Sequence, residues 1–110
     1  MEREEIKQIL LKLKFNLNSK GFDYWIQAIH LYTTFNEPIK MTELYKQLAF
    51  EHLTKETAIE RAMRTASKQA YNEINKYFNY NGKITNSVIL KLFRFYYDII
   101  DFQNHIPHID

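Results

Sequence analysis

The sequence contains no cysteine, and this absence removes several kinds of protein at once. A disulfide-stabilised scaffold, a zinc site built on thiolates and a cysteine nucleophile all require that residue. Long apolar runs are also missing, since none approaches the roughly 20 residues that a membrane-spanning helix needs. The N-terminal run MEREEIKQIL lacks the layout of a signal peptide. We therefore expect a cytoplasmic protein that does not associate with membranes.

Glycine and proline are almost as scarce, with two of each among 110 residues. Two glycines cannot build a phosphate-cradling loop, and few residues are present that would interrupt a helix. Segments that alternate polar and apolar residues, as strands do, are absent as well. The chain has the length of one domain. The pattern predicts an all-α fold of five or six helices over residues 1–103, followed by an irregular tail over residues 104–110.

Apolar residues that recur at helical spacing predict five main helices. Their apolar stripes span residues 6–13, 22–32, 44–49, 59–74 and 88–100. The run LNSKGF separates the first two helices, Pro38 ends the second, and the run NYNGK is the turn before the last. The fourth helix is the longest, at about residues 55–77. The predicted N-caps are Thr42 for the third helix, Thr54 for the fourth, and Thr85 or Asn86 for the last.

Only a few residues separate the third and fourth predicted helices, as in a helix-turn-helix. In that motif the helices cross steeply at close range, so a small residue on the first faces an apolar residue on the second. Ala49 and Ile59, ten residues apart, fill these two places, with Leu48 and Ala62 beside them. Leu53 occupies the turn position where glycine or asparagine is usual, because that position often needs a positive φ. We expect either that this turn differs by one residue or that it does not need the left-handed conformation.

The fourth predicted helix has one apolar face and one polar face. Its core face comprises Ile59, Ala62, Met63, Ala66, Ala70 and Ile74. The opposite face comprises Thr57, Arg61, Arg64, Thr65 and Lys68, with Glu60 at its edge.

The polar face carries the residue types with which a recognition helix contacts the major groove. Arginine pairs with guanine, and a carboxylate accepts a hydrogen bond from cytosine. We assign base reading to Glu60, Arg61, Arg64 and Thr65, and backbone contacts to Thr54, Lys55, Thr57 and Lys68, where the helix N-terminus also favours a phosphate. The alternative is an ordinary solvated face with i,i+4 pairs such as Glu60–Arg64, since the motif also occurs in proteins that bind no DNA. The net charge of +2 is too small to decide between them.

Four runs of the sequence resemble a known family. They are KGFDYWIQAI at residues 20–29, LY at 44–45 with Ala49, IERAMRTA at 59–66, and TNS at 85–87. They are similar to KGYxYLxxAI, LYPxIA and VERAIRHAIxxAW, and to a TNS run, in the C-terminal DNA-binding effector domains of the stage-zero sporulation protein A family of response regulators. The resemblance covers about residues 4–100. It implies a six-helix fold that binds a short G·C-containing box, usually as tandem head-to-tail copies, and it places the family's base-reading residues on Glu60, Arg61 and Arg64.

Three positions depart from the family pattern. Ala58 stands where the family has an arginine, Thr65 where it has a histidine, and Lys46 where it has a proline. Loss of the first arginine removes a guanine contact worth about 1–3 kcal/mol, so the family's target box is not expected to be retained unchanged. The residues before Ile6 are too few for a receiver domain, so we expect no control through phosphorylation of one.

The last predicted helix is apolar on more than one face. Phe93, Tyr96 and Ile100 can face the core, which leaves Phe95 and Phe102 on a separate stripe. Exposed aromatic residues of this kind often mark a partner surface, although the N-terminal helix or the tail would also account for them by covering them. We expect Phe95 and Phe102 to contribute to self-association, as a homodimer or as tandem copies on DNA.

Signatures of catalysis and metal binding are weak. His105 and His108, with Asp101 and Asp110, are spaced too loosely for a metal site, and no Ser/His/Asp signature is present. We expect neither an enzyme nor a cofactor, metal or small-molecule substrate. The predicted function is that of a sequence-specific regulator of transcription that binds double-stranded DNA. The alternative is a protein-interaction module that pairs with a full-length regulator or with another transcription or replication factor.

Overall fold

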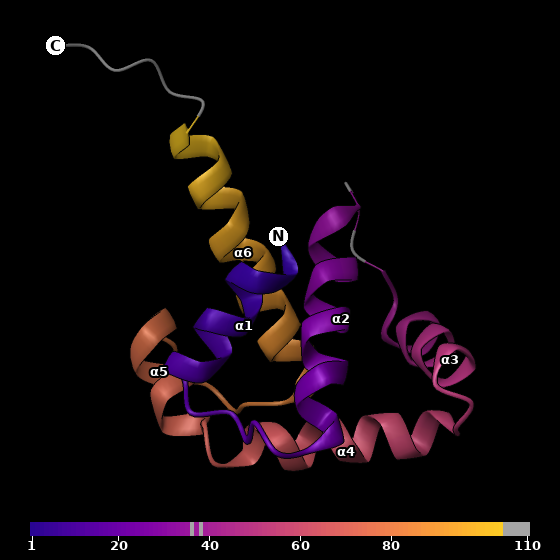
Figure 1. The fold of residues 1–110 in the computed structure, drawn as a ribbon. Helices are drawn as coiled ribbons and strands as arrows, with labels where there is room; N and C mark the ends of the chain where they lie inside the picture. The colour runs from indigo at the N-terminus through magenta and orange to yellow at the C-terminus, as the bar shows by residue number, and fades with distance from the viewer. Residues whose placement is uncertain (36, 38, 105–110) are drawn as a thin grey trace, which may run out of the picture.

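The chain folds into helices joined by short connections (Figure 1). The computed structural model describes residues 1–35, 37 and 39–104, and describes side chains as far as Ile99. Over those residues it contains six helices and no strand, which confirms the all-α class. The helices are α1 (Arg3–Lys12), α2 (Lys20–Thr34), α3 (Met41–Glu51), α4 (Glu56–Lys68), α5 (Tyr71–Phe78) and α6 (Asn86–Asn104). Most of the predicted tail, residues 105–110, lies outside the described residues.

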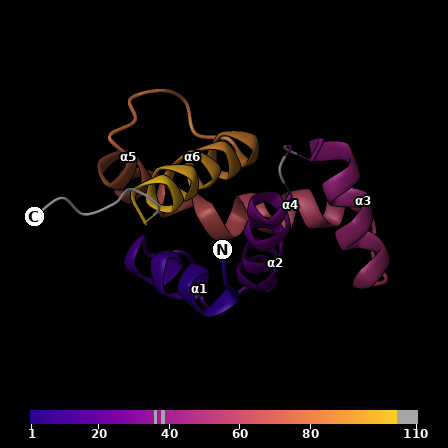
Figure 2. The same ribbon diagram turned by 90° about the horizontal axis from the view of Figure 1, so that it is seen from above.

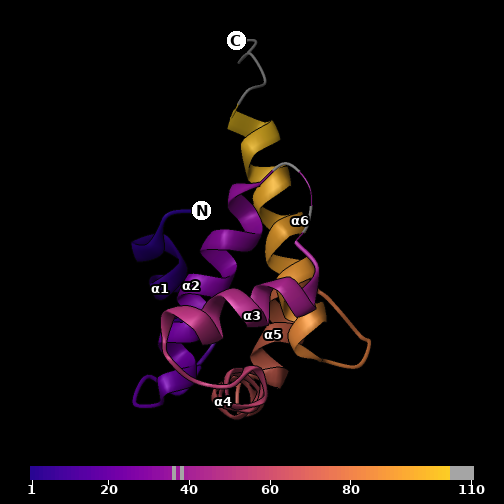
Figure 3. The same cartoon turned by 90° about the vertical axis from the view of Figure 1, so that its right-hand side faces the viewer.

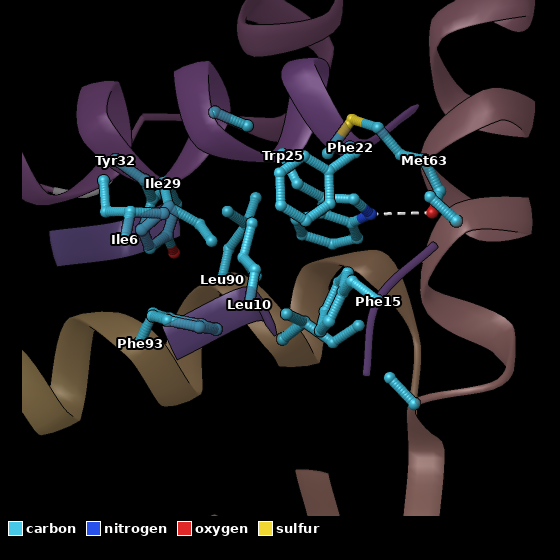
Figure 4. Close-up of a cluster of buried hydrophobic side chains, with 14 of the residues drawn as sticks. Ile6, Leu10, Phe15, Phe22, Trp25, Ile29, Tyr32, Met63, Leu90 and Phe93 are labelled. Atoms are coloured by element: carbon cyan, nitrogen blue, oxygen red, sulfur yellow. Dashed lines mark hydrogen bonds between the residues drawn. The ribbon is translucent and has the colours of Figure 1, made fainter. Parts of the chain in front are cut away.

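Helix α2 is the centre of the packing, since it contacts α1, α3, α4 and α6. Seen from above, α1 and α6 lie on one side of α2 and α3 lies on the other (Figure 2). Side chains from α1, α2 and α6 meet in the core around Trp25 and Phe93, both fully buried (Figure 4). Phe15 meets the Trp25 ring edge-on at 5.7 Å between centroids. Each large apolar side chain buried in this way contributes about 1.5–3 kcal/mol.

The single long helix predicted over about residues 55–77 is instead two helices, α4 and α5. At the break, the N–H of Ala70 donates to the carbonyl of Ser67 (2.9 Å), and the carbonyl of Ala66 accepts from the N–H of Asn16 (3.1 Å). The change of direction leaves both Ala70 and Ile74 fully buried. A donor from a distant part of the chain thus ends α4 without glycine or proline.

Other predicted helix ends differ from the observed ones by a few residues. Helix α2 already begins at Lys20, within the predicted break. Thr42 lies inside α3 and Thr54 lies in the turn before α4, so neither is the residue that immediately precedes its helix. Thr85 is confirmed at the start of α6, where its Oγ1 accepts from the N–H of Val88 at 3.2 Å.

The scarcity of glycine has a visible consequence at the ends of three helices. The residues after α1, α3 and α5 that adopt left-handed backbone are Lys14 (φ 66°), Leu53 (φ 51°) and Asn79 (φ 51°). Each helix closes with a 6→1 hydrogen bond, the arrangement in which glycine usually takes the left-handed place. The bonds run from Phe15 N to Leu10 O (3.1 Å), from Thr54 N to Ala49 O (3.0 Å) and from Tyr80 N to Asn75 O (2.9 Å). Neither glycine has a positive φ.

The arrangement leaves α4 along one outer edge of the molecule, with α2 crossing above it (Figures 1 and 3). Helix α3 lies beside α2 and leads into α4 through a short turn. Among the helices of the described residues, none is long and apolar enough to span a membrane.

Candidate nucleic-acid interface

Helices α3 and α4 pack against each other as the predicted helix-turn-helix pair. Ile59 and Leu48 are fully buried, and Ala49 is 7% exposed. The ten-residue spacing from Ala49 to Ile59 therefore marks two residues that both lie in the core. A small residue at Ala49 allows the two backbones to approach at a steep crossing.

The turn between these helices uses the left-handed conformation at Leu53, so both expectations for this position were wrong. The turn is closed by the Thr54-to-Ala49 hydrogen bond described above, which requires that backbone geometry. The Leu53 side chain is 94% exposed. A left-handed residue with a Cβ costs about 1–2 kcal/mol, and an exposed leucine recovers little of this by burial.

The two faces of α4 are separated as predicted. On the core side, Ile59, Met63 and Ala66 are fully buried, while Ala62 is half-buried. The exposed side chains of the predicted DNA-contacting sets are those of Thr54, Lys55, Thr57, Arg61, Arg64, Thr65 and Lys68. Ala58 is exposed as well, and Glu60 is intermediate. The predicted base-reading and backbone residues thus share one continuous surface along α4 and the turn before it.

Arg64 and Glu60 form the i,i+4 ion pair considered in the alternative interpretation. The distance from Arg64 Nη1 to Glu60 Oε1 is 3.1 Å, and more than half of the Arg64 side chain is exposed. Surface pairs of this kind contribute about 0.3–0.5 kcal/mol. An arginine–guanine contact is worth about 1–3 kcal/mol, so this pair is weak enough to be exchanged for contacts with bases.

The buried side of α4 is held by hydrogen bonds from three separate parts of the chain. Three backbone carbonyls of α4, spaced three residues apart, accept hydrogen bonds. The donors come from α6, from α2 and from the connection between α1 and α2. The bonds are Asn86 Nδ2 to Glu60 O (3.2 Å), Trp25 Nε1 to Met63 O (2.7 Å) and Asn16 N to Ala66 O (3.1 Å). The Trp25 bond is drawn in Figure 4. These contacts fix the position of α4, and hence the direction in which its polar face points.

Gly21 allows α2 to lie directly against α4. A Cβ at Gly21 would come within 2.0 Å of the carbonyl oxygen of Ala62, so no other residue fits without moving a helix backbone. The sequence pattern placed Gly21 in a break between helices, and Trp25 and Asn86 only in the core or at a helix start. Their role in holding α4 was missed, because the partners lie 26 to 41 residues away in the chain and are backbone atoms.

The aromatic surface predicted on the last helix is partly described. Phe95 is 67% exposed, whereas Phe93 is fully buried, as expected. Phe95 lines a surface hollow together with Tyr32 and Lys91. Phe102 and the side chain of Ile100 lie outside the described side chains.

Arg94 supports the hollow next to Phe95 and was missed by the sequence pattern. Its Nη1 donates to the carbonyl of Tyr32 at 2.9 Å, and its Nε lies 3.3 Å from a carboxylate oxygen of Asp98. Arg94 therefore ties α6 to the C-terminal end of α2, where orphan carbonyls attract a cation.

The residues weighed for metal binding lie outside the described part of the chain. His105, His108 and Asp110 are not described, and neither is the side chain of Asp101. Within the described residues, no group of three or more histidine, aspartate or glutamate side chains is placed to hold a metal ion.

Comparison with known proteins identifies the family. A search of curated proteins and a search of solved structures each return no significant match. A family model described as the C-terminal domain of the sporulation initiation factor Spo0A matches residues 6–94. This range contains the whole of the helix-turn-helix pair and the first turns of α6. The chain therefore belongs to the family of Spo0A C-terminal domains, the DNA-binding domains of sporulation regulators.

Proposed function

We propose that this domain is a sequence-specific, double-stranded DNA-binding regulator of transcription that places α4 in the major groove. The observation that carries this proposal is the division of α4 into two faces. One face is pinned through three backbone carbonyls, and the other carries exposed arginine, lysine and threonine side chains. A helix held in this way presents its polar side chains without needing to reorganise its backbone on binding.

We assign base reading to Arg61, Arg64, Glu60 and Thr65. Arg61 and Arg64 are exposed and long enough to donate to guanine, and Glu60 would accept from cytosine once Arg64 leaves it. Because Ala58 has only a methyl group, it cannot donate to a base. The preferred site is therefore expected to differ from that of relatives with arginine there.

The backbone contacts are assigned to Thr54, Lys55, Thr57 and Lys68. The first three lie at the N-terminal end of α4 and in the turn before it, and Lys68 is its last residue. Contacts at both ends would fix the register of the helix in the groove without selecting a sequence.

Selection of bound duplexes from a random pool tests the function, and it should be done at two salt concentrations. Phosphate contacts weaken steeply with salt, whereas contacts to base edges do so less. The proposal predicts one enriched motif, with a larger share of the bound pool at the higher salt concentration. A pool that stays random at both concentrations would contradict sequence-specific binding.

We further propose that Phe95 contributes to self-association, as a homodimer or as tandem copies on DNA. A phenylalanine 67% exposed beside the hollow that it shares with Tyr32 and Lys91 offers apolar area to a second copy. The same surface would serve the alternative function, in which the domain pairs with a full-length regulator. That alternative requires a random pool in the duplex selection together with binding to the partner regulator that depends on Phe95.

A further inference from the structure

A surface hollow lies on each side of helix α4. Figure 3 shows α4 nearly end-on at the lower edge of the molecule, with the α1–α2 connection on one side and the α5–α6 connection on the other. The lining residues of α4 differ accordingly: Ala58, Arg61 and Thr65 border one hollow, while Glu60 and Arg64 border the other. The two hollows therefore flank the surface assigned to base reading.

The first hollow lies between α4 and the start of α2. Lys20 lines the side of this hollow that faces α4, opposite Arg61 and Thr65. Ser19 and Gly21 line the same side as Lys20. Its lining includes two cations, Lys20 and Arg61, and no acidic residue. This composition favours an anion.

The second hollow lies between α4 and the connection that leads into α6. Lys83 and Thr85 line the side of this hollow that faces α4, opposite Arg64 and Glu60. Two cations and one carboxylate line it, so positive charge is in excess, and the carboxylate is already paired with Arg64. This hollow also favours an anion, less strongly than the first.

Lys20 and Lys83 are available for a new partner. Both are exposed, and in the described part of the chain neither forms an ion pair with a carboxylate. Lys14 and Lys46, by contrast, lie within 4.0 Å of Glu73 and Glu43 respectively.

We propose that the two hollows receive the two sugar-phosphate strands that border the major groove, with Lys20 binding one strand and Lys83 the other. The major groove is about 12 Å wide and a helix with its side chains is about 10–12 Å across, so a helix seated in the groove has one phosphate strand on each side. Lys20 and Lys83 line the sides of the two hollows that face α4, so they lie where those strands run. This inference rests on the proposed function, and it adds two contacts from elements outside the helix-turn-helix.

The test compares Lys20→Ala and Lys83→Ala on the duplex selected for the parent protein, with Lys7→Ala as the matched control. Lys7 is an exposed lysine on α1, which packs on α2, and it lines neither hollow. Loss of one phosphate contact lowers the slope of log affinity against log salt by about 0.9, which corresponds to a loss of about eight-fold in affinity at 0.1 M salt. We expect this change for Lys20→Ala and Lys83→Ala, equally on selected and scrambled duplexes, and no change for Lys7→Ala.

Strand assignment comes from duplexes in which single phosphates are replaced by neutral methylphosphonates. Each of the two variants should become insensitive to replacements on one strand only, and the two strands should differ. Slopes equal to that of Lys7→Ala, or insensitivity of both variants on the same strand, would overturn the inference. If the parent protein selects no motif, the proposed function has failed instead, so the two failures are distinguishable.

Discussion

Replacing Gly21 by alanine tests how closely α2 must approach α4. The added Cβ would lie 2.0 Å from the carbonyl oxygen of Ala62 and 2.8 Å from the Cβ of Ala66, and real Cβ contacts are essentially never shorter than 3.0 Å. The obstructing oxygen is part of the α4 backbone and cannot rotate away, so the helices must separate by about 1 Å. Overpacking of this kind costs about 1–3 kcal/mol, and we expect the upper end of that range. Alanine recovers about 1 kcal/mol through its higher helix propensity, which leaves a net loss of about 2 kcal/mol.

Urea unfolding followed by circular dichroism measures this loss, and a thermal scan should show a decrease of about 8 °C in Tm. Gly82→Ala is the matched control, because its Cβ would meet the hydroxyl end of the Tyr80 side chain, which can move, and because Gly82 has no positive φ. We expect the control to change the free energy of unfolding by less than about 1 kcal/mol. A Gly21→Ala protein as stable as the parent would refute the proposed close contact between α2 and α4.

Three further predictions concern the turn, the tyrosines and the aromatic surface. Leu53→Asn should raise the free energy of unfolding by about 1 kcal/mol, because asparagine tolerates the left-handed backbone that leucine resists; unchanged stability in urea would contradict the strain assigned to this turn. The pKa of Tyr77 is raised from 10.0 to about 12, mainly by burial and secondly by the hydrogen bond with Tyr96. Because its folded-state pKa is raised, Tyr77 contributes stability below pH 10 that is lost as the pH rises toward 12. The Tyr77→Phe protein should therefore lose less stability than the parent across that window. A loss equal to that of the parent would refute the assignment. Phe95→Asp should shift the protein toward monomers in sedimentation, whereas an unchanged oligomeric state would exclude Phe95 from the contact.

Much of the fold follows from apolar spacing in the sequence. The stripes predicted in α1, α2 and α3 are buried or half-buried, and the same spacing separates the two faces of α4. In α6 the stripe is buried at Ile89 and Phe93, whereas Ile99 is exposed. This works because burial of an amphipathic face is a local pattern, repeated every three or four residues. The Ala49–Ile59 spacing extended that pattern to a pair of helices and located the helix-turn-helix.

The missed features depend on atoms that are distant in the sequence. Helix α4 ends where the N–H of Asn16 donates to the carbonyl of Ala66. No residue at this break is of a type that predicts a helix end. Leu53 shows the converse, since its own preference opposes the left-handed backbone that the packing of α3 on α4 imposes. The sequence pattern puts Gly21 in the break LNSKGF, although it lies within α2 and makes room for the Ala62 carbonyl.

The candidate site divides in the same way. The exposure of its polar residues follows from a local pattern, and Arg61, Arg64 and Lys68 are on the surface. The Trp25 and Asn86 hydrogen bonds that orient this face were not found, because they reach backbone carbonyls that no sequence pattern distinguishes.

The central claim, that α4 discriminates between base pairs, is tested most directly by the ratio of affinities for the selected duplex and a scrambled duplex. The measurement compares the parent protein with Arg61→Ala, and uses Lys68→Ala as the variant that removes a charge from the same helix. Loss of one arginine–guanine contact of about 1–3 kcal/mol should lower this ratio about 5- to 150-fold for Arg61→Ala. Lys68→Ala should weaken binding to both duplexes equally and leave the ratio unchanged. An Arg61→Ala protein that keeps the parent's ratio would contradict the claim.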